Sequence, residues 1–330
     1  MTSVSRRPVL VAAAAVAGVV AVLVTFVVLA GRDDSAARHA AERYLDVLSD
    51  DSQDPAALAD LVSVGDPSAL ERADALLAAA SERISDVTLG DSREVTTART
   101  TSDVAFDRFE QVEVRYRLAG ERHRATITLG LPRSGSDDDW RVVTPLAGEV
   151  DWNSASWGSA QLDLSVGDIA VTEPGRSTYE PDAQLVHPGV YPVRASVGPY
   201  FGSDETDLAV AAGTRTTPLP EFRLAPTAEG TAVIAEQVRA AFEPCAHGTA
   251  SCPATALVDD DELPTGWWHG LVRDPSVAID GSTITLRDGA FRYASTGGER
   301  TVRFSGTGQV TLDPGTGEPG VAVPLHLERS

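Results

Sequence analysis

The sequence predicts an α+β protein in which an apolar N-terminal helix of membrane-spanning length precedes two modules, each made of helix plus antiparallel sheet. Three observations lead to this fold class. Residues 8–31 carry no charge, residues 34–84 repeat apolar side chains at steps of three and four, and much of 87–145 and 161–330 alternates apolar with polar side chains. A period near 3.6 indicates helix and a period of two indicates strand. Helices followed by strands favour a layered α+β arrangement.

The charge-free stretch from Pro8 to Gly31 is long enough to cross a membrane. As a helix it rises about 36 Å, and a bilayer has a hydrocarbon core of about 30 Å. Arg6 and Arg7 precede it, so the positive-inside rule predicts that residues 1–7 are a cytoplasmic tail and that residues 32–330 lie outside the cell membrane. We therefore expect a single-pass signal anchor and an extracytoplasmic bulk.

A cleaved signal peptide is the alternative for the same stretch. Val28-Leu29-Ala30 has the small-x-small character of a cleavage site. The apolar core of a signal peptide is about 7–15 residues long, and this run is longer, which favours an uncleaved anchor. The sequence leaves open whether the chain is cut after Ala30.

The charge is distributed unevenly along the chain. The net charge is −21, every one of the 48 acidic residues follows residue 32, and all 27 basic residues are arginine. An acidic surface repels nucleic acid and anionic lipid head groups, so we expect no nucleic-acid partner. Solubility alone accounts for such a surface. The expected partners are the membrane, through residues 8–31, and a protein of the cell envelope.

The first module is predicted to span residues 34–145. Asp54-Pro55 and Asp66-Pro67 each place a capping residue before a proline, which is a signal for a helix start. The strands are predicted from alternating residues that follow the helices. They are placed near Val87, at 96–106, 112–118 and 125–129, and at 140–143.

The order of these elements, helices first and then an antiparallel sheet of about four strands, resembles the NTF2-like cone fold. That fold is a common extracytoplasmic domain behind a single anchor. The resemblance covers residues 34–145 and rests on element order and length, because no residue motif supports it. It implies a cone whose interior can hold a ligand or a catalytic site, and it transfers no individual residue.

The rest of the chain is predicted as a linker and a second module. Residues 146–160 are rich in Gly, Ser and Trp and form the predicted linker. Residues 161–330 are predicted to be rich in strands, with one helix from Pro226 to Phe242. Glycine-containing pairs such as Asp288-Gly289 are predicted as turns between short strands.

The layout of the whole chain resembles a group of uncharacterised actinobacterial membrane-anchored exported proteins. The features that carry the resemblance are the anchor, the helical module, the His187–Val193 strand "HPGVYPV", a helix, and Cys245-x6-Cys252-Pro253. The resemblance implies export and a single anchor, and it offers no activity to transfer.

The two cysteines, Cys245 and Cys252, are predicted to form a disulfide, because an exported chain meets an oxidising environment. His247 lies between them and could complete three ligands of a zinc site, but the fourth ligand that tetrahedral zinc needs is missing. The acidic runs 137–139 and 259–262 lack the alternating pattern of a calcium loop. We therefore predict no metal and no cofactor.

Trp267, Trp268 and His269 are the candidate ligand contacts. Adjacent aromatic rings could stack on a sugar or peptide ring beside the imidazole, and packing in the core is the alternative. The motifs G-x-S-x-G, S-x-x-K and H-E-x-x-H are absent from the sequence, so no catalytic residue is predicted, while a Ser–His–Asp set assembled from distant residues stays open.

We expect a non-catalytic cell-envelope protein that binds or scaffolds through its extracytoplasmic modules. The alternative is an exported hydrolase-type enzyme, or a small-ligand sensor, that uses a pocket in the cone-fold module.

Overall fold

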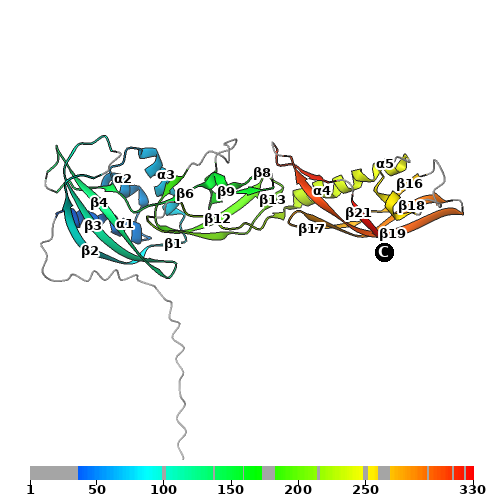
Figure 1. The fold of residues 1–330 in the computed structure, drawn as a ribbon, viewed down its shortest axis with the longest axis horizontal. Helices are drawn as coiled ribbons and strands as arrows, with labels where there is room; N and C mark the ends of the chain where they lie inside the picture. Colours follow the sequence, from blue (N-terminus) through cyan, green and yellow to red (C-terminus); the bar gives the residue numbers. More distant parts are fainter. Residues whose placement is uncertain are drawn as a thin grey trace, which may run out of the picture.

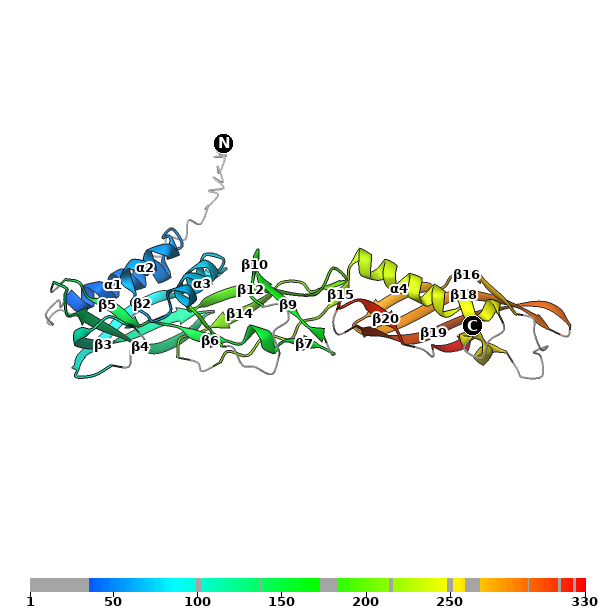
Figure 2. The same ribbon diagram turned by 90° about the horizontal axis from the view of Figure 1, so that it is seen from above.

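The computed structural model is an elongated molecule (Figures 1 and 2). Three regions follow one another along its long axis: an N-terminal region of helices on a sheet, a middle region of strands, and a C-terminal region of one long helix on a second large sheet. The structure describes residues 36–98, 102–136, 138–158, 160–172, 183–213, 216–247, 252–258, 268–295, 297–313, 316–322 and 325–330.

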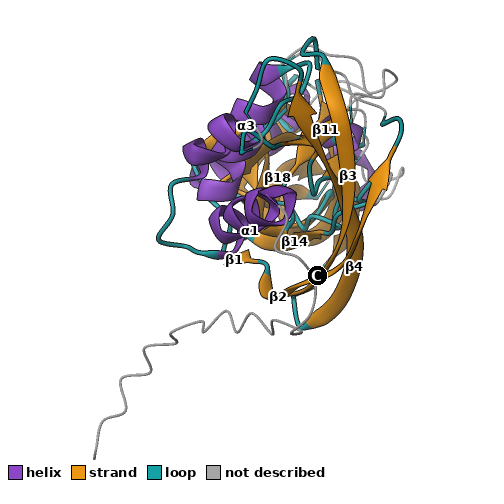
Figure 3. Ribbon diagram, turned by 90° about the vertical axis from the view of Figure 1, so that its left-hand side faces the viewer, coloured by secondary structure: helices purple, strands orange, loops and turns teal. Residues whose placement is uncertain are grey.

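The helices of the N-terminal region begin where the capping residues predict. Asp54 and Asp66 each accept hydrogen bonds from the first backbone N–H groups of the following turn, with proline as the next residue. The apolar faces of these helices turn toward the sheet, and Figure 3 shows α1 and α3 on one side of strands β3 and β4. The helices are α1 (Ala36–Ser49), η1 (Pro55–Ala57), α2 (Leu58–Leu61) and α3 (Pro67–Ala78).

The sheet of this region is antiparallel with the order β2-β3-β4-β5. Its strands are β2 (Ser85–Val95), β3 (Phe106–Leu118), β4 (Glu121–Pro132) and β5 (Arg141–Thr144). Side chains alternate along β3, so Val112, Val114 and Tyr116 are buried under the helices and their neighbours face solvent. The predicted strand over residues 96–106 is wrong for the residues described there, 96–98 and 102–105, because β2 ends at Val95 and the next described strand residue is Phe106.

The middle region is built around β12 (Gly189–Val197), which pairs with β9, β13 and β14 and also with β1 of the N-terminal region. The pairing of Glu82 with Val190 and of Arg83 with Gly189 therefore joins the two regions through backbone hydrogen bonds. The other elements are β1 (Glu82–Arg83), β6 (Gly148–Val150), η2 (Trp152–Ser154), β7 (Ser156–Trp157), β8 (Ala160–Gln161), β9 (Asp163–Val166), β10 (Ile169–Ala170), β11 (Gln184–Val186), β13 (Phe201–Gly202), β14 (Thr206–Val210) and β15 (Ala225–Pro226).

In the C-terminal region, α4 lies across a sheet with the order β16-β18-β19-β20, and β17 and β21 pair with β18 and β19 (Figure 2). The elements are α4 (Ala228–Ala241), α5 (Glu243–Ala246), η3 (Pro253–Leu257), β16 (Trp268–Arg273), β17 (Ser276–Asp280), β18 (Thr283–Ser295), β19 (Gly298–Leu312), β20 (Pro319–Val321) and β21 (His326–Arg329).

The turn predicted at Asp288-Gly289 is wrong, because these residues lie inside one long strand, β18. The register shifts between Leu286 and Gly289, and Asp288 has a φ of +58°, which is the signature of a β-bulge. A Cβ on Gly289 would lie 2.3 Å from the ring of Phe304. Glycine is therefore required here by a close approach across the ladder and does not mark a turn.

The buried apolar residues fall into two clusters. One lies within residues 37–146 together with Val190, and the other runs from Val150 to Leu327 and includes Leu76. Residues of the predicted linker form β6, η2 and β7, and Trp152 is fully buried. The division of the chain into modules remains a prediction.

The predicted membrane span at residues 8–31 lies outside the described residues. Within the part of the chain that the structure describes, no helix has the length and apolarity needed to span a membrane.

Candidate functional site

A groove lies between α3 and the segment that carries η1 and α2, and it encloses about 610 Å³. We call it the α2–α3 groove. One wall is contributed by residues 54–64. The opposite wall is a single stripe of α3, because its lining residues recur at steps of three and four. That stripe consists of Pro67, Leu70, Glu71, Asp74, Ala75 and Ala78.

The groove exists because alanines stand where larger side chains would meet. Ala56 and Ala59 line one wall and Ala75 and Ala78 the other, and all four are exposed. Methyl side chains cannot fill the space between two helical segments, so apolar surface stays open to solvent. Such open apolar surface bordered by polar groups is typical of an interaction site.

The charged groups in the lining of the groove are acidic. Asp54, Glu71 and Asp74 contribute carboxyl groups to the lining, and none of the lining residues is basic. Asp54 caps the following turn by accepting the N–H of Ala56 at 3.0 Å. The groove therefore combines an apolar surface with a negative rim, which complements an apolar partner that carries positive charge.

Asp74 is held by a histidine from the middle region. Its Oδ1 lies 2.8 Å from Nε2 of His187, a residue 113 positions further along the chain, and both side chains are buried. The carbonyl oxygen of His187 accepts a hydrogen bond of 2.6 Å from the hydroxyl of Tyr191. Burial raises the pKa of Tyr191, so its hydroxyl stays protonated and donates this bond. The Asp74–His187 contact therefore fixes α3 against the start of β12.

The same contact bears on the possibility of a Ser–His–Asp set. Ser63 also lines the groove, but its Oγ lies 2.8 Å from Oγ of Ser102. Among the hydrogen bonds of the described residues, none joins Ser63 to His187, and nucleophilic catalysis needs such a contact between nucleophile and base. His187 itself is 0% exposed and lies behind Asp74, outside the lining of the groove.

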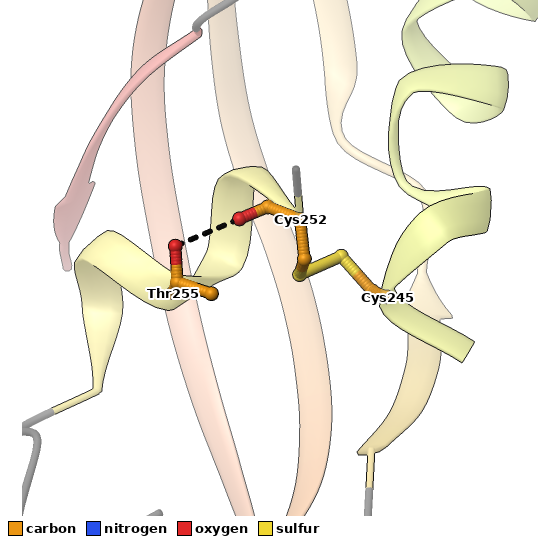
Figure 4. Close-up of a disulfide and its surroundings, with 3 residues drawn as sticks. All are labelled: Cys245, Cys252 and Thr255. Carbon is orange, nitrogen blue, oxygen red and sulfur yellow. Dashed lines mark hydrogen bonds between the residues drawn. A yellow bond between two sulfur atoms is a disulfide. The ribbon is translucent and has the colours of Figure 1, made fainter. Parts of the chain in front are cut away.

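The predicted disulfide between Cys245 and Cys252 is present (Figure 4). It joins α5 to the start of η3, and both cysteines are buried. Thr255 donates its hydroxyl to the carbonyl oxygen of Cys252 at 2.8 Å. His247 is exposed at the end of α5. Because both sulfur atoms are in the disulfide, they are not thiolate ligands for zinc, and no metal-binding group of His, Cys, Asp or Glu occurs within the described part of the chain.

The predicted aromatic contact site is described only in part. Trp267 lies outside the described residues, while Trp268 and His269 open β16, with Trp268 opposite Tyr293 in the ladder. A ligand contact at these residues remains a prediction.

Of the two residues in the buried contact, Asp74 has a signal in the sequence and His187 has none. Asp74 interrupts the apolar stripe of α3 between Ala73 and Leu77, which marks a buried carboxylate in need of a partner. Its partner, His187, lies in the "HPGVYPV" segment, and no spacing rule connects positions so far apart.

The comparisons with known proteins give little similarity. No family model matches the chain, and no curated protein matches it. A search of solved structures finds similarity to an "Ntf2 like protein involved in plasmid conjugation", with 11% sequence identity and a TM-score of 0.20, over 73% of this chain and 78% of that one. A TM-score of 0.20 is too low to support an argument about fold or function.

Proposed function

We propose that this protein is a membrane-anchored, extracytoplasmic binding protein that is not catalytic. In this proposal its N-terminal region takes an apolar segment of an envelope protein, bearing positive charge, into the α2–α3 groove. The observation that carries the proposal is the composition of the groove: an exposed surface of four alanines and Pro67, bordered by the exposed carboxyl groups of Asp54 and Glu71, with no basic residue in the lining. Apolar contact supplies affinity, and the acidic rim selects a cationic partner.

The anchor and the compartment rest on the sequence. The charge-free stretch 8–31 follows Arg6 and Arg7, which supports a single pass with the N-terminus in the cytoplasm. The Cys245–Cys252 disulfide is typical of an oxidising compartment and supports export. Full-length protein recovered from the membrane fraction is expected. Mature chain that begins near Gly31 and appears in the medium would contradict the anchor.

Binding is tested with the full chain in lipid nanodiscs and two synthetic fluorescent peptides. Both peptides carry the same leucine-rich segment, one flanked by arginines and the other by glutamates. Fluorescence anisotropy should show binding of the arginine peptide at least about tenfold tighter, since opposite charge favours and like charge opposes association. Equal affinity for the two peptides would contradict the proposal that the acidic rim selects a cationic partner.

A pair of variants locates the binding. Ala75→Trp fills the groove from α3 and should abolish binding of the arginine peptide. Ala232→Trp, at an exposed position on the distant helix α4, is the matched control and should bind like the unmodified chain. Loss of binding in both variants, or in neither, would contradict the groove as the site.

An exported hydrolase is the second candidate, because the groove lining holds a serine hydroxyl, Ser63, and carboxyl groups, although the hydroxyl is hydrogen-bonded to Ser102 and contacts no imidazole among the described residues. Hydrolysis of p-nitrophenyl acetate by the unmodified chain, absent in Ser63→Ala, would favour this enzyme and overturn the non-catalytic proposal. Equal rates for the two chains would count against it.

A further inference from the structure

An arginine-rich hollow of about 410 Å³ lies on the exposed face of the hairpin formed by β3 and β4. Its lining includes Arg115 and Arg117 of β3, Arg122 and Arg124 of β4, and Thr88 of the neighbouring β2. We call this the arginine hollow. The concentration is unusual because the chain as a whole has a net charge of −21.

The ladder register sets the arginines directly against one another. Arg115 pairs with Arg124 and Arg117 with Arg122 across the two strands. Side chains directly opposite in an antiparallel pair are about 5 Å apart at Cβ, and like charges there are destabilising. Glu113 bridges Arg115 and Arg124, so the unfavourable like-charge pair is Arg117 opposite Arg122, which is expected where positive charge serves to bind a partner.

The carboxylates nearby neutralise part of this charge. Glu113 accepts hydrogen bonds from Arg115, at 2.7 Å, and from Arg124. Asp86 lies 3.6 Å from Arg117. Within the described residues, Arg122 makes no ion pair, and it is exposed. Four guanidinium groups thus face two carboxylates, which leaves an excess of positive charge in the hollow.

The place of the hollow in the fold connects it with the predicted anchor. Arg38, in the first turn of α1, donates to the carbonyl oxygen of Gly90, two residues from Thr88 on the same strand. Four residues, 32–35, separate the apolar stretch from α1, and they span at most about 14 Å. The hollow therefore borders β2, the strand that the start of α1 contacts, and the chain would leave the membrane a short reach before α1.

We propose that the arginine hollow docks on the phosphate groups of anionic lipids at the membrane surface. This inference rests on the anchored location given under the proposed function and is independent of the α2–α3 groove. Guanidinium groups donate two parallel hydrogen bonds to a phosphate, and clustered basic side chains next to a membrane segment bind anionic head groups. The docking orients the rod-shaped molecule on the membrane. The acidity of the whole chain predicts repulsion from anionic lipid, and the local charge of the arginine hollow has the opposite sign.

The test uses the full chain in nanodiscs of phosphatidylcholine with or without phosphatidylglycerol. Thr126 is exposed and lies opposite Glu113, so a cysteine there reports on the hollow, and both native cysteines are in the disulfide. A fluorophore on Thr126→Cys is quenched by head-group spin labels. Quenching should rise by at least about twofold with phosphatidylglycerol and fall in high salt. Equal quenching in the two kinds of disc would overturn the inference.

A matched pair of variants separates the hollow from overall charge. Arg115→Gln, Arg117→Gln, Arg122→Gln and Arg124→Gln together should abolish the response to phosphatidylglycerol. The control variant replaces four exposed arginines of β18 and β19 by glutamine. It therefore has the same net charge as the first variant, and it should keep the response to phosphatidylglycerol. Those four are Arg287, Arg292, Arg300 and Arg303. Circular dichroism verifies that both variants fold, and loss of the response in both would overturn the assignment to the hollow.

Two further outcomes discriminate among sources of the phosphate. Inorganic phosphate that removes the lipid response at matched ionic strength would assign the hollow to a soluble anion and overturn lipid docking. Full chain that fails to co-elute with nanodiscs would contradict the anchor itself, whereas inserted chain without a lipid response would contradict only the docking. Loss of the lipid response alone leaves the proposed peptide binding in the α2–α3 groove unaffected.

Discussion

The N-terminal region holds charged side chains in two contrasting settings. The Asp74–His187 contact is buried at the junction with the middle region, whereas the arginine hollow is open to solvent on the outer face of the sheet. A buried carboxylate must be paired, because leaving it without a partner costs several kcal/mol. Exposed arginines are screened by water and contribute little to stability. Burial thus decides which charges hold the fold together and which remain available to a partner.

The largest expected change in stability comes from breaking the buried Asp74–His187 contact. His187→Leu leaves the Asp74 carboxylate buried without its partner and should lower the free energy of unfolding by about 3–5 kcal/mol. Urea denaturation followed by tryptophan fluorescence measures this. The double variant Asp74→Leu with His187→Leu removes both polar groups and should be less destabilised than His187→Leu alone. A single variant that loses under about 1 kcal/mol would contradict the structural role of the contact.

A smaller effect is expected at the hydroxyl that supports the histidine. Tyr191→Phe leaves the carbonyl oxygen of His187 without its donor in a buried site and should cost about 1–2 kcal/mol. The same denaturation experiment measures it. A loss as large as that of His187→Leu would mean that Tyr191, and not the contact with Asp74, carries the junction.

In the arginine hollow, a substitution is expected to leave the stability of the fold unchanged or to increase it. Arg122→Gln removes a positive charge that faces Arg117 and should leave stability unchanged or raise it by at most about 0.5 kcal/mol. Arg287→Gln, an exposed arginine that faces Ser276 in its ladder, is the control and should show no gain. A clear loss of stability for Arg122→Gln would show that Arg122 stabilises the fold, and it would contradict the contrast between buried charges that stabilise and exposed charges that do not.

The smallest effect is a pH dependence at Glu113. The hydrogen bond from Arg115 lowers the pKa of the Glu113 carboxyl from its ordinary value of 4.5, and the bond from Arg124 acts in the same direction. A pKa that is lower in the folded chain means that the carboxylate stabilises the fold above pH 4.5, and this contribution is lost as pH falls through the lower folded value.

Glu113→Gln should therefore be less stable than the unmodified chain at neutral pH, and the two should converge in acid. Thermal unfolding at a series of pH values measures the difference. A gap that persists unchanged below the folded pKa would assign the effect to packing and not to charge.

The sequence predicts local structure well where a short-range signal decides it. Asp54-Pro55 and Asp66-Pro67 begin helices because cap and proline act within one turn. Alternation along Val112 to Leu118 predicts a strand because one face is buried and the other wet. The disulfide was predictable because its two cysteines are close in the chain and have no competitor.

The features that the sequence did not predict depend on contacts between segments that are far apart in the chain. Asp288-Gly289 looks like a turn, and only the ring of Phe304 on the neighbouring strand explains the glycine. The contact between Asp74 and His187, like the face-to-face arginines, depends on which segments the fold brings together. Periodicity identifies the face of an element and not its partner, so neither the junction nor the arginine hollow was predicted.

The short strand β1 has a mechanical consequence. Ser81 and the two residues of β1 bond to β12, and the buried guanidinium of Arg83 donates to the carbonyl oxygens of Val47, Asp50 and Gln53 behind α1. Strand β1 is thus held to the end of α1 by a buried cation, and the same two residues carry the backbone ladder to β12. Together with the Asp74–His187 contact, the β1–β12 ladder joins the N-terminal and middle regions at two places, so bending between these regions must break one of the two.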